Sequence, residues 1–284
     1  MTCSVELLCI GNELLVGKTT NTNATWLAKK ITVLGGSVKR VTTVGDYVNE
    51  IQEATEAALV RRPDFLITTG GLGPTFDDTT IAGVSKAVKL RLRINKEALT
   101  QIRARYRRIF HSKRFILSKF RLKMAAFPTG ARPLSNPVGT APAMVLQSGK
   151  TTIIALPGVP KELRAIFSEH VAPLIRDKAG TGAYVSRTIQ VTRVFESELA
   201  PLIDRVMKHQ PEVYVKSHPQ GGEGRGTSLI RLDFSYIGHD PRKGHEVVSE
   251  AIAHMRHLLA VRVRQSARKR CRCGRFFITS TLTR

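Results

Sequence analysis

The stretch Asp64–Asp78, which reads DFLITTGGLGPTFDD, decides the fold of this 284-residue chain. It contains the apolar side chains of Phe65, Leu66 and Ile67, continues through three glycines and ends in two adjacent carboxylates. A short apolar run bounded by turn residues is typical of a buried strand, and Thr79–Leu90 has a helical pattern. The sequence therefore predicts a strand, a glycine-rich loop and a helix in direct succession.

Gly70, Gly71 and Gly73 give this loop its candidate chemistry. Glycine has no Cβ, so backbone N–H groups can approach an anion closely and the chain can adopt a positive φ. Asp77 and Asp78 stand where a carboxylate either caps the next helix or holds a metal ion that serves the same phosphate. For the loop by itself, a purely structural turn remains an open alternative.

Two more predicted strands end in polar residues. Val5–Ile10 leads to Glu13 and then to Asn23, which is expected to cap the next helix. Val38–Val44 leads to Asp46, which again stands ahead of a helix. Because ligands bind beyond the carboxyl ends of the strands in an open parallel sheet, these polar residues are candidates for one shared site.

Two later segments rich in proline and glycine are further candidates for this site. NPVGTAP contains Asn136, Gly139 and Thr140, and LPGVPKEL contains Pro157 and Gly158. Proline fixes φ, so both segments are expected to form rigid loops. A role in packing alone stays open for each of them.

Strand and helix patterns alternate through the first half of the chain. Strands separated by helices imply a parallel sheet with right-handed crossovers. Met144–Leu146 and Thr152–Leu156 are predicted to pair through a tight turn, ahead of a helix over Lys161–Ile175. The predicted fold class is α/β, a three-layer sandwich with a mostly parallel sheet, over residues 1–178.

The pattern changes to strand, helix, two strands and helix over residues 183–261, which predicts a small α+β second domain. Pro201 is expected to break the first of its helices. Residues 262–284 are rich in arginine and lack acids, so we expect a basic, disordered tail.

The net charge of +23 favours a nucleic-acid partner at first sight. Much of the excess positive charge is local. Residues 262–284 contain eight lysines and arginines, the stretch Arg103–Lys123 contains nine, and neither segment contains an acid. Such a stretch can bind a nucleic-acid backbone through counterion release. A solvated helix face is the favoured interpretation of Arg103–Lys123, and nucleic acid is not an expected partner. A third alternative is that this segment lies over the ligand cleft and attracts a polyanionic nucleotide.

The sequence predicts no membrane span, because it has no run of about 18 apolar residues. The first residues, MTCSVELLCIGNELL, lack the basic leader of a signal peptide, and we expect a cytoplasmic protein. The four cysteines are too scattered for a disulfide framework and are predicted to be reduced. Cys271 and Cys273 lack the second pair that a zinc site of this kind requires.

Five ordered motifs resemble the MoaB/Mog (molybdopterin-binding-like) domain of the CinA family: GNELLVGKTTNTN, TTVGD, TTGGLGPTFDD, NPVGTAPA and LPGVPKEL. The resemblance covers about residues 4–175. It departs from the family at Asn12, where bacterial members usually have aspartate, and at Ala143, where they usually have glycine. The strand and helix order after residue 183 resembles the small KH-like second domain of CinA-type proteins. Its glycine-rich stretch, 221–226, lies between two strands, whereas an RNA-binding KH loop lies between two helices.

The resemblance implies metal-dependent hydrolysis of a nucleotide diphosphate such as ADP-ribose. It makes Asp46 and Asp78 the catalytic pair and Asp46, Asp77 and Asp78 the ligands of Mg²⁺ or Co²⁺. The remaining candidates would bind the ligand: Glu13, Asn23, Gly70, Gly71, Gly73, Asn136, Gly139, Thr140, Pro157 and Gly158. The alternative is a non-catalytic module that binds molybdopterin or a nucleotide.

The resemblance also bears on the oligomeric state of the protein and on a second enzymatic activity found in the family. Relatives commonly form homo-oligomers, so self-association is expected here. Complete CinA proteins carry a further domain for nicotinamide mononucleotide deamidation. Residues 262–284 leave no room for that domain, so we predict that the deamidase activity is absent.

Overall fold

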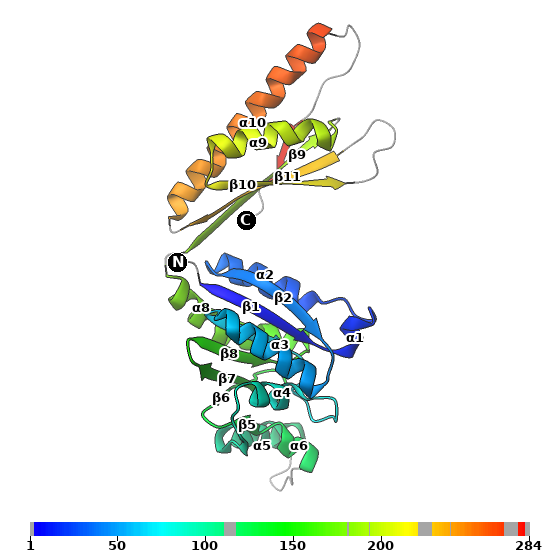
Figure 1. Cartoon of the computed structure of the whole chain (residues 1–284), viewed down its shortest axis with the longest axis vertical. Helices are drawn as coiled ribbons and strands as arrows, with labels where there is room; N and C mark the ends of the chain where they lie inside the picture. Colours follow the sequence, from blue (N-terminus) through cyan, green and yellow to red (C-terminus); the bar gives the residue numbers. More distant parts are fainter. Residues whose placement is uncertain are drawn as a thin grey trace. The chain divides into compact units, whose positions relative to one another are not determined.

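The computed structural model describes residues 3–110, 118–180, 182–192, 194–220, 229–238, 240–269 and 278–281. The chain divides into two compact units, unit 1 (Met1–Ala179) and unit 2 (Gly180–Arg284), which are considered separately (Figure 1). The glycine-rich stretch 221–226 and the cysteines at 271 and 273 lie outside the described residues. Among the helices of the described ranges, none combines the length and the apolar character needed to cross a membrane.

A six-stranded sheet forms the middle layer of unit 1, in the order β2-β1-β3-β8-β7-β6. Its strands are β1 (Ser4–Ile10), β2 (Ser37–Val44), β3 (Phe65–Thr69), β6 (Arg132–Leu134), β7 (Ala143–Ser148) and β8 (Thr151–Leu156). β2, β1, β3 and β8 are parallel neighbours, whereas β7 is antiparallel to both β8 and β6. The prediction of a mostly parallel sheet is therefore confirmed.

Helices cover both faces of this sheet and complete three layers (Figure 1). One face carries α2 (Thr22–Val33), α7 (Pro160–Ile166), a π-helical turn (Phe167–Val171) and α8 (Ala172–Ala179). The other face carries α3 (Val48–Arg61), α4 (Thr80–Ala87) and α5 (Lys96–Phe110). Within β1, Leu7 packs toward the first group and Leu8 toward the second, because successive side chains of a strand point to opposite faces. The predicted three-layer sandwich is confirmed.

Four short elements complete unit 1: α1 (Asn12–Leu15), β4 (Leu92–Ile94), α6 (Lys119–Lys123) and β5 (Ala126–Pro128). β4 and β5 pair with each other in antiparallel fashion. The sequence did not predict β4, β5 or β6, because three residues are too few to show an alternating pattern. The single helix expected over Lys161–Ile175 contains the π-helical turn and continues as α8.

The start of α2 differs from the prediction. Asn21 is the N-cap, and its side chain accepts a hydrogen bond from the N–H of Ala24 at 3.0 Å. An N-cap side chain binds the N–H two or three positions into the helix, and from residue 21 that N–H belongs to Ala24. Asn23, the predicted cap, lies inside the first turn, and its side chain is free for another contact.

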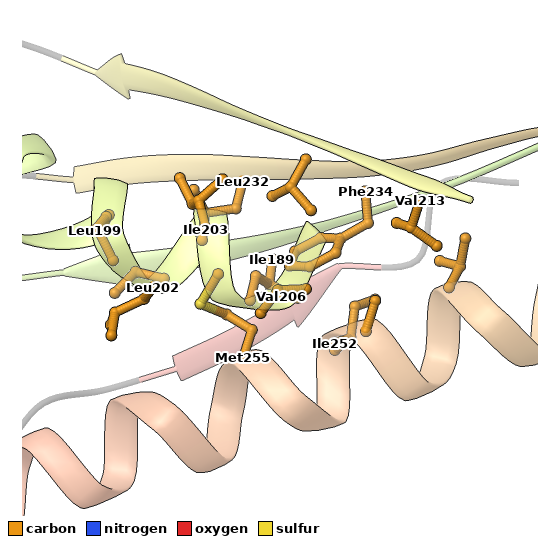
Figure 2. Packing of buried hydrophobic residues seen from close by; sticks show 14 of the residues in the cluster. Ile189, Leu199, Leu202, Ile203, Val206, Val213, Leu232, Phe234, Ile252 and Met255 are labelled. Atoms are coloured by element: carbon orange, nitrogen blue, oxygen red, sulfur yellow. The ribbon is translucent and has the colours of Figure 1, made fainter. Parts of the chain in front are cut away.

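Unit 2 contains a four-stranded antiparallel sheet in the order β10-β11-β9-β12. Its elements are β9 (Ala183–Thr192), α9 (Glu196–His209), β10 (Val213–Gln220), β11 (Leu229–Gly238), α10 (Pro241–Lys269) and β12 (Ile278–Thr281). Ile189 and Phe234 from the sheet pack with Leu199 of α9 and Met255 of α10 in a separate hydrophobic core (Figure 2).

Two expectations for unit 2 are wrong. Pro201 does not break α9, which runs from Glu196 to His209, because the buried side chains on either side of it hold the helix against the sheet. The tail is not irregular from residue 262, since α10 continues to Lys269 and β12 pairs with β9. Once a helix has formed, each residue added to its end makes one more hydrogen bond. The helix can therefore extend beyond the part that is buried.

Candidate functional site

Four loops of unit 1 meet at the carboxyl edge of the parallel strands. They follow β1, β2, β3 and β8 and begin at Gly11, Gly45, Gly70 and Pro157. The N–H of Gly70 donates to the carbonyl oxygen of Leu156 at 3.0 Å, and a Cβ on Gly70 would overlap the carbonyl oxygen of Ile10. Gly70 also has a φ of +101°, so only glycine lets the loops after β1, β3 and β8 pack this closely.

Asp46 joins the loops that follow β1, β2 and β3. Its Oδ2 accepts a hydrogen bond from the N–H of Asn12 at 2.7 Å. Its carbonyl oxygen accepts a hydrogen bond from Oγ1 of Thr79, also at 2.7 Å. The structure thus brings Asp46 beside the segment that contains Asp78.

The carboxylates around Asp46 share one electrostatic environment. Burial raises the pKa of Asp46 above its ordinary value, and the negative charges of Glu13, Asp77 and Asp78 raise it further. The hydrogen bond from the N–H of Asn12 opposes these effects on the pKa. Glu13, Asp77 and Asp78 therefore lie close enough to act on Asp46, and a cation bound beside Asp46 would offset their effect.

The loop after β3 holds Asp77 and Asp78 through Thr75. The N–H of Thr75 donates to Oδ2 of Asp78 at 2.7 Å, and its hydroxyl lies 2.5 Å from the same atom. The Thr75 hydroxyl also contacts Oδ1 of Asp77, and this hydrogen bond lowers the pKa of Asp77. A Cβ on Gly73 would lie 2.6 Å from Oδ2 of Asp78, so glycine allows the carboxylate to lie over the loop backbone.

The same loop offers backbone donors to an anion. For the N–H groups of Gly71, Leu72 and Gly73, no acceptor is found among the described residues. Gly71 has a φ of +63°, and successive N–H groups in such a turn form a concavity that binds anions. Gly71 and Gly73 thus fit the predicted cradle, whereas the N–H of Gly70 is already bonded to the strand β8.

Asn23 reaches the loop that follows β8. Its Nδ2 donates to the carbonyl oxygen of Gly158 at 2.7 Å, whereas its Oδ1 is buried and has no partner among the described residues. Because buried polar atoms are nearly always hydrogen-bonded, this oxygen suits an N–H donor of a ligand. Pro157 is buried and Gly158 is exposed, so Pro157 contributes packing and Gly158 lies at the surface of the site.

Asn136 organises its own loop. Its Oδ1 accepts hydrogen bonds from the N–H groups of Val138 and Gly139, at 3.1 and 2.7 Å. Its Nδ2 donates to the carbonyl oxygen of Ala141 at 2.8 Å and to Oε2 of Glu162 at 2.7 Å. These four bonds use both donors and both lone pairs of the amide. Asn136 therefore positions the loop and has no polar group left for a ligand.

Thr140, the last candidate of this loop, is half-buried. No hydrogen bond from its hydroxyl to another described residue is seen. Gly139 lies against Glu162, because a Cβ on residue 139 would overlap the Glu162 carboxylate. Of the three predicted residues of this loop, Thr140 is therefore the one whose side chain could bind a ligand through a polar group.

The predicted ligand set of Asp46, Asp77 and Asp78 is not assembled as a three-residue metal site. Within the ranges that the structure describes, no three His, Cys, Asp or Glu side chains are arranged to hold a metal ion. Asp77 and Asp78 each direct an oxygen to Thr75 instead. Two carboxylates are still enough for Mg²⁺, which takes one or two of them and completes its shell with waters and substrate phosphates.

A hollow of about 50 Å³ opens beside the glycine loop. Gly71, Gly73, Asp78 and Lys123 contribute to its polar side, and Asp46 does not line it. A cavity that holds a benzene ring measures about 150 Å³, so this hollow is too small for a pterin or a purine base. A ligand with a ring system must therefore lie along the open edge of the sheet.

Four residues that shape the site were not among the predicted site residues. They are Asn12 and Thr79, which bind Asp46, Glu162, which binds Asn136, and Lys123, whose Nζ lies 2.5 Å from the carbonyl oxygen of Thr75. Thr79 could have been found, because it follows Asp78 directly and is the first residue of a predicted helix. Lys123 gives no local signal, since it is one of nine cations in a single stretch.

The fold and this edge define a class of protein, an α/β domain whose glycine-rich and polar loops gather beyond the carboxyl ends of its parallel strands. Residues 6–177 match the family model described as the probable molybdopterin binding domain. Because this match covers more than half of the chain, the chain belongs to that family. The resemblance to the MoaB/Mog domain is thereby confirmed.

Relatives extend over most of the chain. A protein of Pyrobaculum aerophilum is 46% identical over 245 residues, which cover 86% of this chain and 90% of the relative. A protein of Aeropyrum pernix is 46% identical over 227 residues, which cover 80% and 82%. The solved structure of CinA from Thermoplasma acidophilum, a protein of unknown function, is 39% identical with a TM-score of 0.55. That match covers 60% of this chain and 98% of the solved chain, in agreement with the predicted CinA resemblance.

Proposed function

We propose that unit 1 binds a nucleotide diphosphate such as ADP-ribose at the carboxyl edge of its sheet and hydrolyses the diphosphate with the help of a divalent cation. One observation carries this proposal. Asp46 is hydrogen-bonded to Asn12 on one side and to Thr79, next to Asp78, on the other. The segments after β2 and β3 that carry Asp46 and Asp78 are therefore bonded to each other, beside a loop whose N–H groups can receive a phosphate.

Asp46 and Asp78 would hold the cation. Burial, and then the neighbouring acids, raise the pKa of Asp46, and a bound cation would stabilise its ionised form. A bound Mg²⁺ or Co²⁺ would neutralise phosphate charge and lower the pKa of a bound water. Asp77 fits a supporting role, because its carboxylate contacts the Thr75 hydroxyl within the loop.

Asn23 and the glycine loop would bind the ligand itself. The N–H groups of Gly71 and Gly73 would donate to phosphate oxygens. The unpaired Oδ1 of Asn23 would accept a hydrogen bond from the base or the pterin ring. Glu13 is exposed at the same edge, where it can accept a hydrogen bond from a ligand hydroxyl.

A second candidate function is a module that binds molybdopterin or a nucleotide without turnover. It is favoured by the finding that the described residues contain no three-residue metal site. In that case the carboxylates would serve only to orient ligand N–H or hydroxyl groups.

Incubation with ADP-ribose and Mg²⁺ or Co²⁺, followed by chromatography of AMP, separates the two functions. Asp78→Asn is the informative variant, because its side-chain oxygen can still accept the hydrogen bonds from Thr75. We expect AMP release to fall by at least about 100-fold, since the group that holds the cation loses its charge. Asp177→Asn, an exposed acid of α8, is the matched control and should keep full activity. Saturable binding without AMP release from the unmodified chain would establish the binding module instead.

A further inference from the structure

The basic segment of the chain touches two of the loops that form the site. From α6, Nζ of Lys123 lies 2.5 Å from the carbonyl oxygen of Thr75, in the loop after β3. From α5, Nη2 of Arg105 donates to the carbonyl oxygen of Val138, in the loop that Asn136 organises. Two side chains of the stretch Arg103–Lys123 therefore reach the site from outside the sheet.

Stacking between α5 and α6 fixes the direction of Lys123. The guanidinium carbon of Arg121 lies 4.5 Å from the ring centre of Tyr106 and 5.5 Å from that of Phe110. These contacts hold the Arg121 side of α6 against α5. Residues two positions apart on a helix are separated by about 200°, so Lys123 points away from that contact and toward the glycine loop.

Lys123 stands among the acids of the site. It lines the same hollow as Gly71, Gly73 and Asp78. After the stronger effect of the Thr75 hydroxyl, the positive charge of Lys123 also lowers the pKa of Asp77. Its ammonium group therefore lies near the N–H groups that would receive a phosphate.

Arg105 has spare hydrogen-bonding capacity. It is half-buried, and its Nε is shielded from solvent without an acceptor among the described residues. A guanidinium group has five N–H donors in a planar fork, which suits the oxygens of a phosphate. The contact with Val138 uses only part of this capacity.

The charge of the site favours such cations. Glu13, Asp77 and Asp78 act on Asp46 through their negative charge, and acids at this edge disfavour a ligand with several phosphates. One divalent cation offsets two of the four negative charges and leaves the rest. A diphosphate adds further negative charge, so cations from the protein would favour its binding at this edge.

We propose that Lys123 and Arg105 form the cationic side of the ligand site and select ligands with two or more phosphate groups over monophosphates. The proposal rests on the proposed function. In this proposal, two residues of the stretch Arg103–Lys123 contact the ligand, and the exposed cations of the same stretch lie outside the site. The ligands that the site selects are nucleoside diphosphates and their esters.

Equilibrium binding of ADP-ribose and of AMP, measured by titration calorimetry on the full chain at several salt concentrations, tests the proposal. Lys123→Met keeps the length of the side chain and removes its charge. We expect this variant to bind ADP-ribose about tenfold more weakly, whereas its affinity for AMP should change by less than about twofold. The slope of log affinity against log salt concentration for ADP-ribose should become shallower by about one unit, because one cation is lost. Arg105→Met should act in the same direction.

Exposed cations of the same helices provide matched controls. Lys119 of α6 and Arg103 of α5 are exposed, and no contact between either side chain and the two loops is seen in the described part of the chain. Lys119→Met and Arg103→Met should bind both ligands like the unmodified chain.

The outcomes distinguish this inference from the proposed function. If the unmodified chain binds ADP-ribose and Lys123→Met binds it equally well, the inference is overturned and the proposed function stands. If Lys123→Met loses thermal stability and weakens both ligands equally, Lys123 only holds the loop and the inference also fails. If the unmodified chain binds neither ligand, the inference and the proposed function fail together.

Discussion

At the scale of single residues, Asp46 illustrates how a functional carboxylate opposes stability. Its pKa is raised by burial and by neighbouring acids, so its ionised form is disfavoured in the folded protein. A group with a raised folded-state pKa stabilises the fold at pH values below its unfolded pKa. This contribution is lost as the pH rises through the folded-state pKa.

Asp46→Asn is therefore expected to raise the melting temperature at pH 7 by about 1–2 °C, the scale of interactions between exposed charges. The amide oxygen can still accept the hydrogen bond from Asn12. The gain should disappear below about pH 4, where the unmodified carboxyl is itself protonated. Thermal melts of both proteins at the two pH values measure this difference. A variant that is less stable at pH 7 would contradict the electrostatic explanation.

Residue types alone predict candidate acids but not what each polar group binds. Asp46 and Asp78 are candidates because each follows a strand and precedes a helix. Asn136 looked equally suited to a ligand, yet its amide is fully used within its own loop. Lys123 gives no local signal in the sequence, because its position depends on the stacking of α6 on α5. A sequence pattern predicts where a side chain lies along an element, but not which partner saturates it.

At the scale of elements, the first turn of α2 separates the residue that caps the helix from a candidate site residue. Asn21 caps the helix, whereas Asn23 contacts the loop after β8. Asn21→Ala should lower the free energy of unfolding by about 1 kcal/mol, because the N–H of Ala24 loses its acceptor. Urea unfolding measures this change, and Asn21→Asp should retain most of the stability. If Asn21→Ala were neutral and Asn23→Ala costly, the assignment of the cap would be wrong.

The elements that the sequence predicted well are those bounded by strong local signals. β3 begins and ends as expected, because Pro63 and Gly70 flank a continuous buried run. α9 was expected to stop at Pro201, but the packing of Leu199, Leu202 and Val206 keeps it intact. Local sequence signals therefore determine where an element begins and ends. The burial of its side chains determines whether a proline inside it interrupts the helix.

At the scale of the whole molecule, all candidate site residues belong to unit 1, and each unit has its own hydrophobic core. A fragment of residues 1–179 is expected to fold alone and to bind ADP-ribose within about twofold of the affinity of the full chain, because domains with separate cores are stable independently. Circular dichroism and titration calorimetry on the fragment test this expectation. A folded fragment with affinity reduced by tenfold or more would show that unit 2 contributes to the site.

The π-helical turn at Phe167–Val171 has a consequence for tolerance to deletion. A π-helical turn holds one residue more than an α-helical turn, so removing one residue from it would restore α geometry with little rotation of the helix that follows. Ile175 and Ala179 would then keep facing the sheet, because the wide turn already absorbs the extra residue. A single-residue deletion within Phe167–Val171 should therefore be tolerated, whereas the same deletion within α7 or α8 would turn the side chains that follow it by about 100°.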